Sequence, residues 1–206
     1  MKFVCDSLDL SDAAVTVVKA CATRTLTPVL ECIRMQVKND KVTLSAYDGE
    51  LSIEKSFKAD VLEEGEACVN GRLFTDFIGK ISHTQITIGT EEKGLEIRYD
   101  DSRSFMQVLP ADEFPLLDCG DVAGSFEVEE GKFKNLVARS IFCCATDDSR
   151  PILKGCLLET EGKILRASAL DGYRMATTEC EIKNGDDGKK IVCPARTLGE
   201  IARMLD

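Results

Sequence analysis

Two stretches of the 206-residue chain repeat each other at a spacing of 123 residues. The motif PIL at 151–153 follows PVL at 28–30 at this spacing, and ALDG at 169–172 follows AYDG at 46–49. In both copies an Asp-Gly pair lies between runs typical of strands, which predicts a β-hairpin. The repeat constrains the fold strongly, because both copies must then form similar units.

Helical periodicity recurs on either side of the hairpins. We expect helices over 10–24, 71–82, 131–141 and 195–206, with Ser11 or Asp12 as the N-cap of the first. Strands are predicted over 2–7, 29–37, 41–47, 50–57, a run ending near 70, 85–88, 95–99, 104–109 and 125–128. The first and third helices share an apolar pattern, in which Leu10, Ala13, Ala14, Val18 and Cys21 correspond to Phe133, Leu136, Val137, Ile141 and Cys144. The pattern predicts an α+β fold with two helices packed on an antiparallel sheet in each repeat.

The repeats divide the chain into a first domain over 1–120 and a second over 121–206, with the small, polar stretch 119–124 as the linker. After its second helix the first copy continues for about 35 residues of predicted strand, which the second copy lacks. A half-domain would leave unpaired sheet edges that promote aggregation. We therefore expect the second domain to be truncated at its C-terminal end, and the chain to be part of a protein with more repeats downstream.

Composition narrows the class of protein. The chain is 44% apolar and 30% charged, and it contains no run of 18 apolar residues that could span a membrane. The N-terminal segment MKFVCDSLDL is unlike a signal peptide, so we expect a cytoplasmic protein. The ten cysteines include no C-x-x-C pair, and His83 is the single histidine. We expect reduced, buried thiols and neither a metal nor a cofactor.

The net charge of −10 argues against a basic footprint over the whole surface. The four predicted helices nevertheless carry nine Lys or Arg and four Asp or Glu. Basic helices on an acidic protein suit loose, salt-dependent contact with phosphates, although they also fit ordinary solvated faces. Readout of base sequence is not expected, because no helix has the clusters of Arg, Asn or Gln that contact base edges.

Several separated motifs resemble one family in order and spacing. The segments LPADEFPLLD at 109–118, RPILKGCLLE at 150–159 and ASALDGYRMA at 167–176 resemble signature segments of the bacterial DNA polymerase III beta subunit, the replicative sliding clamp. The N-terminal MKFVC and TPVLECI at 27–33 agree as well. The resemblance covers the whole chain and implies three domains of this size, of which the third is absent here.

The resemblance implies a DNA-clamp fold and a head-to-tail homodimeric ring around double-stranded DNA, with helices lining the hole. Such a ring catalyses nothing itself and makes synthesis processive. Its implied partners are the alpha subunit of the replicative polymerase, the clamp loader and other proteins with a clamp-binding motif. Dimerisation would use the helix at 71–82 and the strand at 104–109, so without a third domain we expect a monomer or a weak oligomer.

The resemblance also implies two sets of site residues. The DNA-binding residues would be Arg24, Arg72, Lys80, Arg150, Arg196 and Arg203. The loop 146–151 lacks the aromatic DNA contacts of the family and carries two acids, so Arg150 would only partly replace them. The peptide-binding pocket would be formed by Leu153, Leu170, Gly172, Tyr173, Arg174 and Met175. Its other half would come from the missing third domain.

Two other functions remain open from the residues. An enzyme could use Asp147, Asp148 and Asp171 as an acid–base or metal cluster. Against this, turn chemistry alone explains Asp171, and the chain has no Gly-rich phosphate loop and no G-x-S-x-G motif. A protein-interaction adaptor that does not bind DNA would also suit the acidic charge and the apolar pocket. We therefore predict no catalytic residue.

Overall fold

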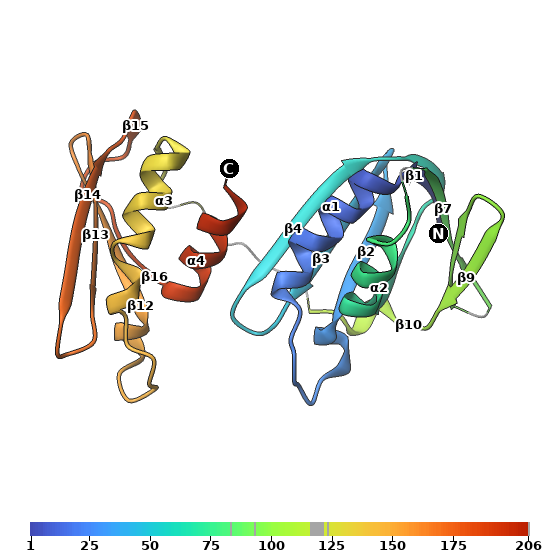
Figure 1. Ribbon diagram of the computed structural model, residues 1–206, viewed down its shortest axis with the longest axis horizontal. Coiled ribbons are helices and arrows are strands. Elements are labelled where there is room, and N and C mark those ends of the chain that lie inside the picture. Colours follow the sequence, from blue (N-terminus) through green and yellow to red (C-terminus); the bar gives the residue numbers. More distant parts are fainter. Residues whose placement is uncertain (83, 93, 116–121, 123, 206) are drawn as a thin grey trace. The chain divides into compact units, whose positions relative to one another are not determined.

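The computed structural model describes residues 1–82, 84–92, 94–115, 122 and 124–205. The chain divides into two compact units, Met1–Asp118 and Cys119–Asp206, each with its own hydrophobic core (Figure 1). Most of the predicted linker 119–124, part of the segment 109–118 and His83 lie outside the described residues. No described helix is long and apolar enough to cross a membrane.

The first unit contains two antiparallel sheets of five strands. The sheet ordered β5-β1-β7-β8-β9 is formed by Lys2–Asp6 (β1), Asp60–Glu63 (β5), Gln85–Glu91 (β7), Gly94–Tyr99 (β8) and Ser102–Met106 (β9). The sheet ordered β10-β6-β2-β3-β4 is formed by Cys32–Lys38 (β2), Lys41–Tyr47 (β3), Ser52–Lys58 (β4), Gly65–Asn70 (β6) and Val108–Leu109 (β10). The strand β9 therefore lies at the edge of its sheet.

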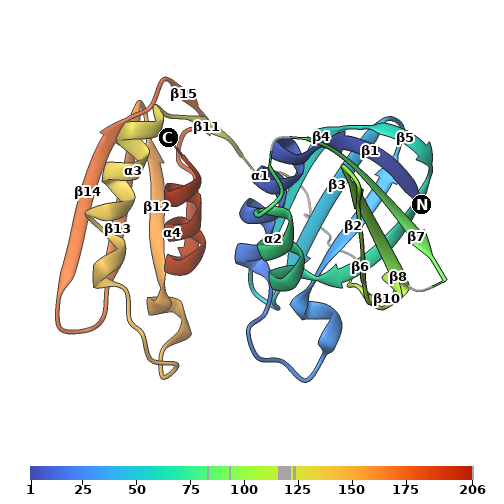
Figure 2. The same ribbon diagram turned by 45° about the vertical axis from the view of Figure 1, so that its right-hand side comes forward.

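Helices α1 (Ser7–Val17) and α2 (Gly71–Ile78) lie side by side along the β2–β3–β4 sheet (Figures 1 and 2). Their buried faces and the inward residues of both sheets form one core. Phe74 of α2 is fully buried there, and burial of one such side chain contributes roughly 2 kcal/mol to stability. Short 3₁₀ turns follow at Val18–Ala20 (η1), Pro28–Glu31 (η2) and Ala111–Glu113 (η3).

The predicted bounds were wrong where side chains bond locally to the backbone. The first helix begins at Ser7 instead of 10, because the Asp6 carboxylate caps it and accepts a hydrogen bond from the Leu8 N–H at 2.7 Å. Ser11 and Asp12 therefore lie inside α1. The helix ends at Val17 instead of 24, and the strand predicted from 29 begins at Cys32, after η2.

The second unit repeats half of this arrangement. Its main sheet is ordered β14-β13-β12-β16 and consists of Gly155–Glu161 (β12), Ile164–Leu170 (β13), Met175–Glu181 (β14) and Lys190–Pro194 (β16). Helices α3 (Glu130–Ala138) and α4 (Ala195–Met204) cover one face of it (Figure 2). A two-stranded sheet joins Phe126–Glu127 (β11) and Asn184–Gly185 (β15), and 3₁₀ turns occupy Ile141–Cys143 (η4) and Pro151–Lys154 (η5).

The repeat read from the sequence is present in the strand pairing. The order β16-β12-β13-β14 matches β6-β2-β3-β4 of the first unit. The register matches too, because Ile33 pairs with Val69 and the corresponding Cys156 pairs with Cys193. Among the described residues, the second unit has no counterpart of β7, β8 and β9.

Most described cysteines behave as small apolar residues. Seven of the nine are buried, which confirms the predicted burial. Burial raises the pKa of the Cys5, Cys21 and Cys68 thiols to about 12. These thiols therefore stay protonated at neutral pH, in which form they are poor nucleophiles and poor metal ligands.

Gly94 offers a test of the β8–β9 pairing. Its φ is +116°, and an added Cβ would meet the Met106 carbonyl oxygen of β9 at 2.3 Å. Gly49 has a similar φ of +104° with nothing within 4 Å of the added Cβ, so Gly49→Ala carries the backbone strain alone. We expect Gly94→Ala to destabilise the first unit by about 1–3 kcal/mol more than Gly49→Ala, the usual cost of overpacking. Hydrogen exchange of the β8 and β9 amides measures the difference, and equal protection in both variants would contradict it.

Candidate functional site

A single carboxylate builds the hairpin between β13 and β14. Asp171 Oδ1 accepts hydrogen bonds from the backbone N–H groups of Tyr173 at 2.9 Å and Arg174 at 3.0 Å. These bonds close a four-residue loop, 171–174, between the paired residues Leu170 and Met175. Gly172 has a φ of +95°, which a glycine adopts without steric cost. The Asp-Gly pair therefore does form a hairpin, with a longer loop than the minimal two residues.

The same hairpin fixes the side chain of Arg174. Its Nε donates to Asp171 Oδ2 at 2.9 Å, and a terminal nitrogen donates to the Phe142 carbonyl oxygen at 3.0 Å. The guanidinium carbon lies 5.9 Å from the centre of the Phe142 ring. Hydrogen bonds from the Tyr173 and Arg174 backbone, then from the Arg174 side chain, lower the pKa of Asp171. Asp171 therefore remains ionised at neutral pH.

Phe142 was not predicted as a site residue. It lies in η4, and its side chain is 57% exposed although both residues after it are buried. Comparison of the two repeats could have indicated this residue. Phe142 stands where the first copy has Lys19. An exposed aromatic residue at a position where the first copy has a charged one points to a surface contact.

The other predicted pocket residues form an exposed apolar surface on the second unit. Met175 is 64% exposed and Tyr173 fully exposed, while Leu170 is 38% exposed. Leu153 is half-buried. Its carbonyl oxygen accepts a hydrogen bond from the Ala145 N–H, and its own N–H donates to the Arg150 carbonyl oxygen. Ile152, which was not predicted, is also exposed here. Their distribution over one hairpin and one 3₁₀ turn suits contact with a short apolar segment.

Both acids of the loop 146–150 have partners nearby in the sequence. Asp147 accepts from the Ser149 side chain and backbone, and these bonds lower its pKa. Asp148 forms an ion pair with Lys154 at 2.6 Å. The guanidinium of Arg150 lies 3.5 Å from the position of a Cβ on Gly172, so it sits beside the 171–174 hairpin. Arg150, predicted to bind DNA, is thus brought together with the predicted peptide-binding residues.

The remaining predicted DNA-binding residues are all exposed. In the first unit Arg24 lies between η1 and η2, and Arg72 is the second residue of α2. These segments meet, because an added Cβ on Gly71 would lie 2.5 Å from Cys21 Sγ. Lys80 was expected inside the second helix and lies two residues beyond its end. In the second unit Arg196 is the second residue of α4, and Arg203 in its last turn pairs with Glu200.

The predicted excess of basic residues in the helices was wrong. Within the observed bounds, α1 to α4 carry five basic residues and five acidic ones: Arg72, Lys132, Lys134, Arg196 and Arg203 against Asp9, Asp12, Asp76, Glu130 and Glu200. The other cations expected in helices follow the helix ends instead: Lys19, Arg24, Lys80 and Arg139. Cations beyond a helix C-terminus are favoured by the helix dipole. Lys80 and Arg139 follow their helices closely enough for this effect to operate.

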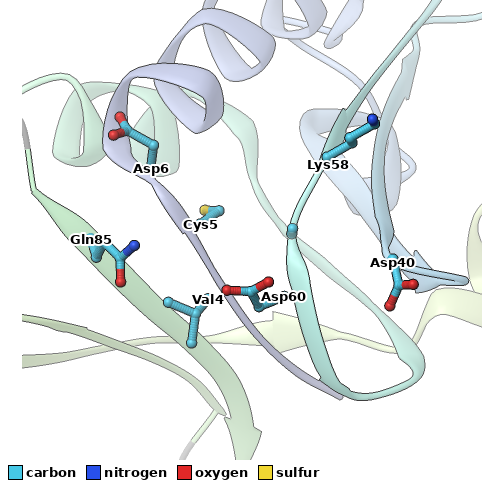
Figure 3. Close-up of a pocket in the computed structure, with 8 residues that line it drawn as sticks. Val4, Cys5, Asp6, Asp40, Lys58, Asp60 and Gln85 are labelled. Carbon is cyan, nitrogen blue, oxygen red and sulfur yellow. The ribbon is translucent and has the colours of Figure 1, made fainter.

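A surface hollow on the first unit contains none of the predicted site residues. It lies between β1, the start of β5 and the β2–β3 turn, and Asp6, Asp40 and Asp60 surround it together with Lys58 (Figure 3). Its acidic rim disfavours a phosphate. Burial raises the pKa of Cys5, which also lines it, so no thiolate nucleophile is present there.

Asp147 and Asp171, two of the acids weighed for catalysis, are each held in a local turn. Asp147 and Asp171 have lowered pKa values, whereas a general acid or base at neutral pH needs a raised one. Among residues 1–82, 84–92, 94–115, 122 and 124–205, no group of three His, Cys, Asp or Glu side chains could hold a metal ion. The arrangement suits binding through an apolar surface and a fixed guanidinium.

Comparison with known proteins identifies both units. Residues 1–118 match the family model of the DNA polymerase III beta subunit N-terminal domain, and residues 127–206 match that of its central domain. The chain is 27% identical to the beta sliding clamp homolog GriR of Streptomyces muensis over 213 residues, which covers 100% of this chain and 56% of that protein. It is also 27% identical to the beta sliding clamp of Halalkalibacterium halodurans, covering 91% of this chain and 53% of that one.

The fold agrees with the sequence comparison. The crystal structure of the DNA polymerase sliding clamp from Bacillus subtilis superimposes with a TM-score of 0.93 at 25% identity, over 100% of this chain and 57% of that one. The chain thus spans a little over half the length of the relatives it matches. The predicted α+β clamp fold is confirmed, and the chain belongs to the DNA polymerase III beta subunit family.

Proposed function

We propose that this protein is a sliding clamp subunit, which encircles duplex DNA and tethers the replicative polymerase for processive synthesis. The observation that carries this proposal is the succession of the family's N-terminal and central domains along the chain. The first unit would be the first clamp domain, and the second unit would be part of the central domain. A third domain would complete the ring-forming protein.

The proposal assigns no chemistry to the clamp itself. Asp147 and Asp171 are committed to turns by their hydrogen bonds, which supports a role in binding only. The nucleotidyl transfer would belong to the polymerase alpha subunit. The clamp loader and other proteins with a clamp-binding motif would share the surface around the 171–174 hairpin. These partners act on cytoplasmic DNA, so the cytoplasm is the expected compartment.

DNA contact would come from the predicted set Arg24, Arg72, Lys80, Arg150, Arg196 and Arg203. All six are exposed. The balanced charge of the helix bodies favours contact through residues at the helix starts and just beyond the helix ends, such as Arg24, Arg72 and Lys80. Contact of this kind reads no sequence, because it is made with phosphates alone.

The strand β9 supports a head-to-tail homodimer. It is an edge strand with one unpaired side, and such an edge readily pairs with another chain. Phe105 on this strand is 40% exposed, and the Arg103 guanidinium lies 4.8 Å from the centre of its ring. Leu73 on α2, the helix also expected at the dimer face, is 58% exposed.

The direct test of the proposal is primer extension on a circular template. The clamp loader and polymerase of the same organism are supplied with the protein expressed from its native gene, whose intact mass is first measured. A mass of about three repeats and long products from single binding events are expected. Products no longer than those made without the protein would refute the processivity role.

Salt dependence separates a clamp from an adaptor that does not bind DNA. We expect the affinity of the native protein for duplex DNA to fall as salt rises, and Arg72→Ala to reduce the log–log slope by about one. Lys41→Ala is the matched control, because it also removes one positive charge. Lys41 is the first residue of β3, next to the β2–β3 turn, and its removal should leave the slope unchanged. No measurable binding of the native protein to duplex DNA would favour the adaptor, and equal effects of both variants would exclude Arg72 as a phosphate contact.

The dimer surface is tested by a charge at the sheet edge. We expect Phe105→Asp to raise the dimer dissociation constant of the protein with its third domain at least tenfold, because a charge would be buried without a partner. Leu62→Asp is the control, since Leu62 is similarly exposed on β5 at the opposite edge of the same sheet. Analytical ultracentrifugation measures both variants, and an unchanged Phe105→Asp dimer would exclude this face. The 206-residue chain itself is expected to be a monomer or a weak, non-native oligomer.

A further inference from the structure

We propose that Asp171 and Phe142 are positioning residues, which hold the Arg174 guanidinium in one orientation for a partner peptide, and that the Phe142 ring is a further apolar contact of that surface. The inference rests on the proposed function of the 171–174 hairpin as a peptide-binding site. It adds residues to the site and defines the chemistry that the partner must present.

The two carboxylate oxygens of Asp171 accept hydrogen bonds from different groups. Oδ1 accepts the two backbone N–H groups that shape the turn, while Oδ2 accepts from Arg174 Nε. The turn and the orientation of the arginine are therefore set by one residue. An ionised acceptor strengthens these bonds relative to a neutral one.

Phe142 also contacts the Arg174 guanidinium. Its carbonyl oxygen accepts from a terminal guanidinium nitrogen, and its ring lies against the same group. The η4 turn fixes this position, because Cys143 N–H donates to Ser140 and Cys144 N–H donates to Ile141. Cys143 and Cys144 are buried, so the backbone of Phe142 is anchored while its ring stays exposed.

The first unit serves as an internal comparison. Asp48 forms the same turn there, accepting from the N–H groups of Glu50 at 3.0 Å and Leu51 at 2.9 Å. Leu51, at the position of Arg174, is buried, and Lys19 stands where the second unit has Phe142. The turn is therefore shared scaffold. At these two corresponding positions, an arginine and an aromatic ring that contacts it are found in the second unit and not in the first.

A guanidinium has five N–H donors in a planar fork. Asp171 Oδ2 and the Phe142 carbonyl engage two of its nitrogens on one side, while 60% of the Arg174 side chain is exposed to solvent. Tyr173 and Met175, the chain neighbours of Arg174, are exposed as well. The matching partner is a peptide that presents a carboxylate or carbonyl oxygen next to an apolar side chain.

The substitution Asp171→Asn isolates the positioning role. The asparagine Oδ1 can still accept the two turn N–H groups, whereas its NH₂ group cannot accept from Arg174 Nε. Asp48→Asn makes the same change in the turn without an arginine and is the matched control. Nitrogen-15 NMR of arginine side chains in the 206-residue chain reports whether Arg174 Nε–H is protected from exchange with solvent.

We expect a protected Arg174 Nε–H signal in the wild type and in Asp48→Asn, and its loss in Asp171→Asn. Binding of the polymerase alpha subunit to the native full-length protein should weaken about three- to tenfold in Asp171→Asn, because an unfixed side chain must be ordered on binding. Retention of the signal, or equal weakening in Asp48→Asn, would overturn the positioning role. If the wild type does not bind the alpha subunit, the proposed function fails, while the NMR signal still decides whether Arg174 is held.

Phe142→Leu separates the ring from the backbone carbonyl. We expect the Arg174 Nε–H signal to survive, since both hydrogen-bond acceptors remain, and the affinity to fall about two- to tenfold through loss of the aromatic contact. Unchanged affinity would show that the ring is not part of the binding surface. Loss of the NMR signal would show that the ring, rather than the carbonyl, holds the arginine.

Discussion

Burial of one sheet face beneath two helices is the constraint on which both units depend. The two copies satisfy it with different side chains. Where α1 presents Leu10 and Ala13 to the core, α3 presents the larger Phe133 and Leu136. The sheet changes in the opposite direction, since the cross-strand pair Ile33 and Val69 becomes Cys156 and Cys193. Larger helix residues over smaller strand residues keep the core filled, as close packing requires. This exchange of volume accounts for Cys156 and Cys193.

Once the core is fixed in this way, function can only lie in what the repeat leaves variable at the surface. The hairpin turns illustrate this. Asp48 and Asp171 make the same backbone bonds, so neither turn is evidence of a site by itself. The residue three positions after each aspartate has a different environment in the two units. Leu51 is buried in the core, whereas Arg174 is exposed and contacts Phe142. A duplicated scaffold thus provides its own control for separating structural residues from functional ones.

The sequence predicted the repeat, the strand order of the hairpins and the buried helix positions, because these follow from periodicity and from turn chemistry. The predicted starts of α1 and β2 were wrong, because local contacts set these element bounds. Asp6 starts α1 earlier than the apolar pattern indicates, and the η2 turn after Pro28 delays β2. Phe142 could not be found from periodicity, since its contact with Arg174 joins segments 32 residues apart. The resemblance supplied the six pocket residues; the geometry that connects Arg174 to its supports required coordinates.

The observed helix bounds also change the balance of basic and acidic residues in the helices. With the predicted bounds the helices were basic, whereas with the observed bounds their charges balance and Lys80 and Arg139 lie just beyond helix ends. A helix C-terminus carries partial negative charge, so cations placed there stabilise the helix while remaining exposed to solvent. The same residues can then contact phosphates without the cost of burying charge along a packed helix face. Weak contact of this kind would suit the clamp function proposed here, and it is compatible with an acidic net charge.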